Sequence, residues 1–178
     1  NLPRTRHCNT MDTSLPSTTS LPRRNWIILA LILLIGGALR GYALTHGTGD
    51  HPDELHIVSH ALRLSWTKLN PERFAYGSLV YYILRAGIGV SELFGFSESS
   101  GEAGYIIGRS IALVCALVIT LLTWLLAYRT YQDYRIALGA AGFFLFNMFS
   151  LQVSHYYTSD ILLTVWGMSI FVCAERLV

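Results

Sequence analysis

The chain has 178 residues, of which 52% are hydrophobic and only 13% are charged, and its formal net charge is +2. Soluble globular domains carry about 25% charged residues, so this chain lacks the polar surface of a soluble domain. The composition also excludes a disordered chain, a nucleic-acid binder built on basic patches and a secreted domain held together by disulfides. A lipid bilayer is the remaining environment for so apolar a chain, whose mean hydropathy is +0.43.

The first 24 residues differ in composition from the rest of the chain. They are rich in Ser, Thr, Pro and Arg and have no apolar periodicity. This predicts a disordered cytoplasmic tail over residues 1–24. Met11 is a more natural start than Asn1, which makes residues 1–10 a candidate upstream extension.

Long apolar stretches follow the tail. A transmembrane helix needs about 20 apolar residues, and we predict four such helices, at residues 25–44, 105–128, 136–154 and 160–177. Arg23 and Arg24 before the first stretch are also typical of a signal peptide, but the cleavage site is poor and further spans follow. The sequence therefore predicts an all-α membrane protein.

The segment at residues 77–95 decides the topology of the chain. Arg85 lies near its middle, where a charge in the bilayer costs about 3 kcal/mol. Ser78, Arg85 and Glu92 are spaced by seven and form one polar line along a helix, which is typical of a helix at the membrane interface. We therefore predict that this segment does not cross the membrane.

The distribution of basic residues supports the same topology. Basic residues near transmembrane helices are retained on the cytoplasmic side. If residues 77–95 do not cross, the arginines that flank the first three spans all lie on that side; they are Arg23, Arg24, Arg129 and Arg135. This leaves residues 45–104 as one long outer loop, in which we expect two amphipathic surface helices.

The outer loop begins with an acidic motif, His51-Pro52-Asp53-Glu54. Proline in the first turn and acidic side chains near the positive end of the helix dipole favour a helix start here. We predict that this helix runs to about Trp66, with Asp53, His56 and His60 on its polar face. Its apolar face predicts that the helix lies flat on the membrane.

Three roles are open for these side chains. Acidic residues at a helix start can act as capping groups alone. One carboxylate and two imidazoles on a shared face, here Asp53, His56 and His60, can bind a divalent metal, although no HExxH spacing is present. A carboxylate at the membrane surface can also act as a general base that takes a proton from a hydroxyl acceptor. Residue type alone does not separate these roles.

A second polar cluster lies at residues 154–160, between the third and fourth predicted spans. It contains His155, Tyr156 and Asp160, of which Asp160 either caps the following helix or belongs to a site. Arg40 and Arg109 each lie near the outer end of a predicted span. An arginine there can bind a lipid phosphate or simply extend its charged group toward water.

In this order, the motifs resemble the polyprenyl-phosphate-sugar glycosyltransferases of the GT-C superfamily. The first span ends in Ala-Leu-Arg-Gly-Tyr, His-Pro-Asp-Glu opens an amphipathic helix, Gly-Arg-Ser opens the next span, and a His-Tyr-x-x-x-Asp junction follows. Residues 25–178 are similar to the N-terminal part of glycosyltransferase family 39, the protein O-mannosyltransferases, and of the bacterial aminoarabinose transferases of lipid A. Because family members continue through further spans, we expect the chain to be a fragment of a longer enzyme.

The resemblance implies an inverting transfer of a sugar from a polyprenyl-phosphate donor to a hydroxyl group of a protein, glycan or lipid. The reaction is expected at the outer face of the plasma (inner) membrane. Asp53 matches the family's catalytic base and Glu54 its acidic neighbour. The residues expected near the donor phosphate are Arg109, His155, Tyr156 and Asp160.

The chain departs from that family pattern at two places. His56 stands where the aminoarabinose transferases have an arginine, and Ala75-Tyr76-Gly77 replaces their Glu-Lys-Pro before the second surface helix. The donor sugar is therefore left open, no cofactor is implied beyond the divalent metal considered above, and no nucleic-acid partner is expected. The alternative from another class is a non-catalytic membrane scaffold or assembly subunit whose outer loop binds a partner.

Overall fold

The computed structural model describes residues 23–42, 44–45, 51–65, 67–71, 75–95 and 101–177. Within these ranges the chain is helical, with one isolated β-bridge and no strand, which confirms the all-α prediction. The helices are α1 (Arg23–Gly41), α2 (Pro52–Arg63), α3 (Ser78–Leu93), α4 (Gly101–Tyr131), α5 (Tyr134–Phe146), α6 (Met148–Val153) and α7 (Ser159–Ala174), and a short 3-10 turn (Glu175–Leu177) follows. The predicted tail lies outside the described residues except for its last two arginines, which begin α1.

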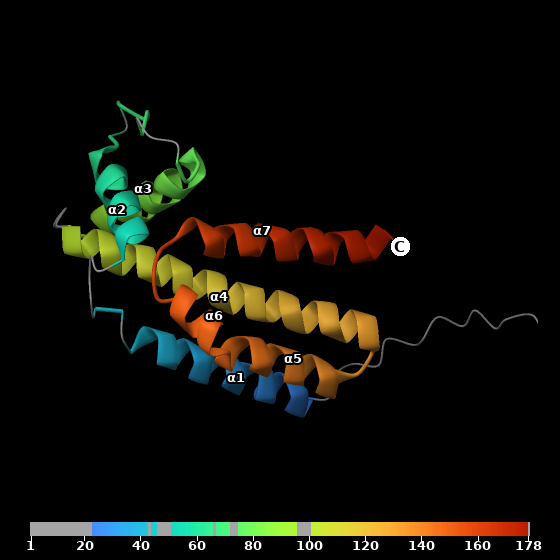
Figure 1. Cartoon of the computed structure of the whole chain (residues 1–178). Coiled ribbons are helices and arrows are strands. Elements are labelled where there is room, and N and C mark those ends of the chain that lie inside the picture. Colours follow the sequence, from blue (N-terminus) through green and yellow to red (C-terminus); the bar gives the residue numbers. More distant parts are fainter. Residues whose placement is uncertain are drawn as a thin grey trace, which may run out of the picture.

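The helices α1, α4, α5 and α7 lie side by side and run in alternating directions along the chain (Figure 1). The longest of them, α4, is central and contacts α1, α2, α3, α5 and α7. The two helices α2 and α3 pack against each other and against the N-terminal end of α4. The start of α7 and the end of α1 lie at this same end of the four-helix layer.

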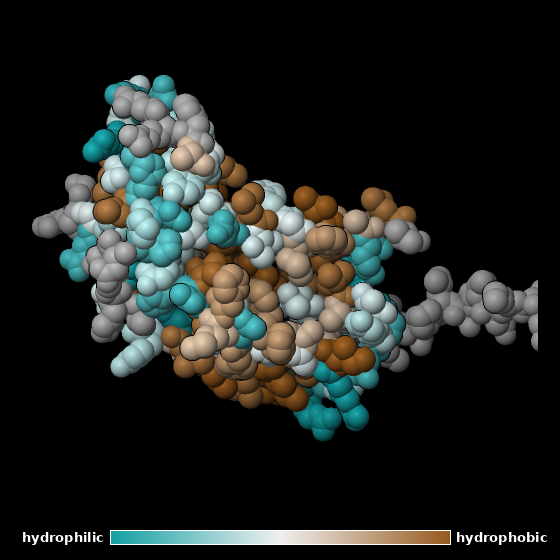
Figure 2. Space-filling view, in the orientation of Figure 1, coloured by the Kyte–Doolittle hydropathy of each residue, from teal (hydrophilic) through white to brown (hydrophobic). Residues whose placement is uncertain are grey.

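Two of the helices, α1 and α4, are long and apolar enough to span a membrane. Large apolar side chains on the layer are exposed, among them Leu34 on α1 and Trp166 on α7. Hydrophobic residues cover much of the visible face of the layer, whereas hydrophilic residues gather around α2 and α3 (Figure 2). An exposed apolar surface of this extent is typical of lipid contact, so the fold indicates membrane association.

The third predicted span, residues 136–154, is not one continuous helix. The chain leaves helical geometry at Asn147, where φ is −62° and ψ is 130°, so that α5 ends and α6 begins. The Asn147 side chain accepts hydrogen bonds from the backbone N–H groups of Phe149 and Ser150. The side chain of Asn147 thus caps α6 and favours a break in the helix at this residue. A hydropathy profile does not detect such a break, because it does not measure capping.

The helix at the acidic motif starts at Pro52 as predicted, but it ends at Arg63 and not near Trp66, which lies outside the described residues. Its apolar face was expected to rest on the membrane, and this expectation is wrong. Ile57, Val58 and Ala61 are fully buried in a cluster with side chains of α3, α4 and α7. An amphipathic pattern shows that one face is buried and does not show whether lipid or protein covers it.

The charge in the middle of α3 has a partner on its own helix. Arg85 Nη1 lies 3.2 Å from Glu92 Oε1, one of the two other residues of the predicted polar line. The pair is partly exposed, with 16% of the Arg85 side chain and 33% of the Glu92 side chain accessible. Residues 80–88 of α3 contribute apolar side chains to the same cluster that buries α2.

The close approach of α1 to α5 depends on a glycine. A Cβ atom at Gly36 would overlap the side chain of Leu145, which is fully buried. Small residues at helix contacts of this kind let the two backbones approach closely. A Cβ atom at the next residue, Gly37, would lie 3.7 Å from Leu117 Cδ1, which is an ordinary van der Waals distance.

We therefore expect Gly36→Ala to destabilise the protein by about 1–3 kcal/mol, because the fully buried Leu145 side chain must shift to admit the added methyl group. Gly37→Ala is the matched control, since it makes the same change on the same helix and should have little effect. Thermal unfolding in detergent micelles measures both. Equal effects of the two variants would contradict the described packing of α1 on α5.

Candidate functional site

Four segments that are distant in sequence meet where α2 packs on α4. They are the end of α1, the first turn of α2, the first turns of α4 and the connection between α6 and α7. These segments carry most of the residues that the sequence singles out. The contacts among them define the candidate site.

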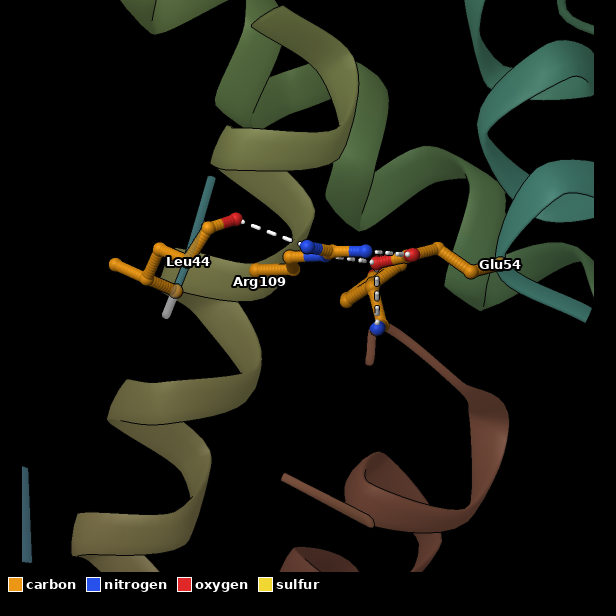
Figure 3. Close-up of polar contacts among 4 residues, drawn as sticks. Leu44, Glu54 and Arg109 are labelled. Carbon is orange, nitrogen blue, oxygen red and sulfur yellow. Dashed lines mark hydrogen bonds and ion pairs between the residues drawn. The ribbon is translucent and has the colours of Figure 1, made fainter. Parts of the chain in front are cut away.

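The centre of this region is an ion pair between Glu54 of α2 and Arg109 of α4. Arg109 Nε donates to Glu54 Oε1 at 2.9 Å and Nη2 donates to Oε2 at 2.8 Å, so the pair is bidentate (Figure 3). Both side chains are 0% exposed. Planar two-point pairing of this kind fixes the relative orientation of the two groups as well as their distance.

Backbone groups add further hydrogen bonds to the pair. Arg109 Nη1 donates to the carbonyl oxygen of Leu44 at 3.0 Å, and the N–H of Tyr157 donates to Glu54 Oε1 at 3.2 Å (Figure 3). The ring of Tyr156 lies beside the guanidinium, whose carbon is 5.5 Å from the ring centroid. A buried charge pair is tolerated when its remaining donors and acceptors are satisfied, and these contacts tie all four segments to one pair.

A glycine lets the α6–α7 connection approach α4. A Cβ atom at Gly108 would lie 2.9 Å from Tyr157 Cβ and 3.1 Å from Tyr157 Cγ. Tyr157 is fully buried, its hydroxyl donates to the carbonyl oxygen of Val80 at 3.0 Å, and its burial raises the pKa of its phenol. The side chain therefore stays protonated and joins the connection to α3.

Asp53, the neighbour of Glu54, has different surroundings. It is half-buried, and its Oδ1 accepts a hydrogen bond from the hydroxyl of Tyr76 at 2.7 Å. That hydrogen bond to a carboxylate raises the pKa of the Tyr76 phenol. Two adjacent acids are thus separated by the fold, because successive residues of a helix point about 100° apart.

The two histidines of α2 stack on each other. The rings of His56 and His60 have centroids 4.2 Å apart, and His60 Nδ1 lies 2.9 Å from the carbonyl oxygen of His56. In the part of the chain that the structure describes, no three His, Cys, Asp or Glu side chains gather closely enough to hold a metal ion.

The connection between α6 and α7 places its polar residues unevenly. The ring of Tyr156 lies 4.7 Å from the ring of His51, next to the start of α2, and the ring of His155 meets Tyr156 edge-on at 5.4 Å. Asp160 is exposed in the first turn of α7. The described contacts thus bring His155 and Tyr156 to the acidic motif, and they include none between Asp160 and Asp53 or Glu54.

A second arginine, Arg40 at the end of α1, is also buried, at 2% exposure. Its Nε donates to Ser154 Oγ at 2.7 Å and its Nη2 donates to Ser150 Oγ at 3.1 Å. Among the described residues it forms no ion pair, and its hydrogen bonds go to neutral oxygens. Ser150 lies on α6 and Ser154 directly follows it, so both serines come from the segment after the helix break at Asn147.

An apolar pocket of about 270 Å³ opens between α4, α5, α6 and α7. Phe143, Phe149 and Ile161 are among its lining residues, and so is Ser150, the hydrogen-bond partner of Arg40. The pocket therefore reaches a serine that binds the buried Arg40, although Arg40 is not among its lining residues.

Sequence reasoning missed several of these contacts. Tyr76 drew notice because it departs from the family pattern, and nothing in the sequence linked it to Asp53. The spacing of Ser150 and Ser154 by four residues puts both on one helix face, which is the signal that could have assigned them to Arg40. The carbonyl of Leu44 has no sequence signal.

Comparison of the chain with protein families, with curated proteins and with solved structures finds no match.

Replacing Glu54 with Gln should leave the buried Arg109 guanidinium without its counter-charge and cost about 3–5 kcal/mol of stability. The matched control is Glu92→Gln, which breaks the partly exposed pair with Arg85 and should cost about 1 kcal/mol or less. Thermal unfolding of both variants in detergent provides the comparison. A Glu54 variant as stable as the Glu92 variant would show that the pair does not hold the four segments together.

Proposed function

We propose that this protein is a membrane glycosyltransferase, in which Asp53 is the general base for transfer of a sugar from a polyprenyl-phosphate donor to a hydroxyl acceptor. One observation carries the proposal. Of the two acids in the motif, Glu54 is fully buried against Arg109, whereas Asp53 stays half-buried beside it. One acid thus anchors the helix and the other remains available for chemistry.

Anchoring matters because a general base must be held within hydrogen-bond reach of the proton that it removes. The Glu54–Arg109 pair fixes the first turn of α2, and Ile57 and Val58 fix the next turn in the apolar cluster. A site carried by a rigid helix holds its geometry better than a site on a loop. Asp53 therefore has the support that a base requires, which a capping residue does not need.

The proposed topology has four membrane-spanning segments. They are α1, α4, α5 together with α6, and α7. The end of the layer that carries α2 and α3 is then the outer face. The turn between α4 and α5, with Arg129 and Arg135 on either side, lies at the opposite end of the layer. Basic residues at that end suit the cytoplasmic side, which supports this orientation.

In the proposed reaction, Asp53 takes the proton of the acceptor hydroxyl while that oxygen attacks the anomeric carbon. The bond from the anomeric carbon to the phosphate oxygen breaks with inversion, and its electron pair leaves with the polyprenyl phosphate. The developing charge on the phosphate needs donors nearby. Arg109 is engaged with Glu54 and holds the α6–α7 connection in place, so that His155 and Tyr156 are the groups that meet the phosphate.

Two further features suit a lipid-linked donor. The apolar pocket between α4, α5, α6 and α7 offers an apolar surface for part of a prenyl chain. Asp160, which the family resemblance places near the donor phosphate, is exposed in the first turn of α7. Protein, glycan and lipid hydroxyls all remain candidate acceptors.

Asp53→Asn in the full-length protein should reduce transfer from a labelled polyprenyl-phosphate sugar by about 10²–10⁴-fold, because the amide cannot accept the proton. The melting temperature should stay near that of the wild type, since Tyr76 can still donate to the amide oxygen. Glu102→Gln, an exposed acid at the start of α4, is the control and should keep full activity.

Retained transfer in the Asp53 variant would refute Asp53 as the base. If the wild-type protein in native membranes transfers no lipid-linked sugar, the proposal as a whole fails. The scaffold alternative would then account for the chain.

A further inference from the structure

We propose that Tyr76 is a positioning residue, whose hydroxyl holds Oδ1 of Asp53 so that Oδ2 is presented to the acceptor hydroxyl. The assignment of a catalytic purpose to this contact rests on the proposed function above. The contact itself can be tested without it.

The first support is the isolation of the Asp53 carboxylate from other constraints. Tyr76 Oη lies 2.7 Å from Asp53 Oδ1, and the two residues are 23 positions apart in the chain. In the described part of the chain, this is the only hydrogen bond that the Asp53 side chain accepts. Rotation of a carboxylate about its last side-chain bond is broadly permitted, so one short hydrogen bond decides how the group is turned.

The second support is the way in which the chain holds Tyr76. The next residue, Gly77, has φ of +75° and ψ of 148° and precedes the first turn of α3. Residues with a Cβ atom rarely adopt that conformation. Two residues into α3, Val80 is buried in the cluster that also buries α2, so the turn that carries Tyr76 is fixed relative to Asp53.

The third support is the packing of the Tyr76 ring. Its centroid lies 5.7 Å from that of His56, one turn beyond Asp53 on α2. The position of the ring is therefore restricted by its contact with α2 and by the backbone turn at Gly77. Its hydroxyl meets the carboxylate as a result of both restraints.

The chemical consequence is a division between the two carboxylate oxygens. Oδ1 is occupied by a donor, and Oδ2 keeps its lone pairs for the proton of the acceptor. Tyr76 does not exchange its own proton during the transfer, because its hydrogen bond to Asp53 raises the pKa of the phenol. A displacement of about 1 Å in a reacting group can cost about 10²-fold in rate, so an untethered carboxylate should react more slowly.

Tyr76→Phe removes the hydroxyl and keeps the ring against His56. In the full-length protein we expect kcat for transfer to fall by about 10- to 100-fold, while KM for the polyprenyl-phosphate sugar changes by less than about two-fold. The matched control is Tyr82→Phe, which removes an exposed hydroxyl that donates to the carbonyl oxygen of Leu69 at 2.9 Å. This control should leave both constants unchanged.

A spectroscopic measurement tests the contact independently of activity. The ultraviolet titration of the wild type minus that of Tyr76→Phe isolates the Tyr76 phenol, which should ionise at a higher pH than an ordinary tyrosine. When the same pair of proteins also carries Asp53→Asn, the Tyr76 phenol should ionise at a lower pH than it does beside Asp53. The reason is that the carboxylate that disfavours the phenolate is gone.

The proposal is overturned if Tyr76→Phe keeps the wild-type kcat, or if the Tyr76 titration is the same with and without the Asp53 carboxylate. A lower melting temperature together with equal losses in Tyr76→Phe and Tyr82→Phe would also overturn it, since both hydroxyls would then be merely structural. If the wild-type protein shows no transfer, the proposed function fails and the titration alone decides whether Tyr76 holds Asp53.

Discussion

The buried pair of Glu54 and Arg109 is the constraint on which the rest of the site depends. Neither charge can be left alone in an apolar interior, because removing a charged side chain from water costs several kcal/mol when it has no partner. The fold meets this demand with two side-chain bonds and with backbone groups from Leu44 and Tyr157. Four segments are held together as a result, so the position of α2 on α4 follows from the chemistry of one pair.

The Glu54–Arg109 pair also determines the position of Asp53. It is the residue before Glu54 on the same helix, so once Glu54 faces α4, Asp53 must face the side on which Tyr76 lies. The separation of two adjacent carboxylates also limits their mutual repulsion, since one is neutralised by an arginine and the other receives a neutral hydroxyl. The proposed base is thus placed by an interaction in which it takes no part.

Polar interactions are concentrated at this end of the helix layer, and the rest of the layer is joined mainly by apolar contacts. Arg40 is a second buried arginine at this end, and its guanidinium donates hydrogen bonds to neutral serine hydroxyls instead of a carboxylate. Both serines come after the helix break at Asn147. Close approaches at Gly36 and Gly108 bring α5 and the α6–α7 connection near enough for these bonds to form. Small residues and a helix break are therefore part of how the site is built.

The sequence by itself determined the all-helical class, the two longest apolar helices and the helix start at Pro52, because hydropathy, periodicity and capping are local signals. It did not determine that α2 rests on protein, that Asn147 divides an apolar run, or that Arg109 meets Glu54 and Tyr76 meets Asp53. Tyr76 and Asp53 are 23 positions apart in the chain, and Arg109 and Glu54 are 55 positions apart. Only the tertiary structure could decide these contacts, because a buried polar group takes whichever partner the packing of helices brings within hydrogen-bond distance.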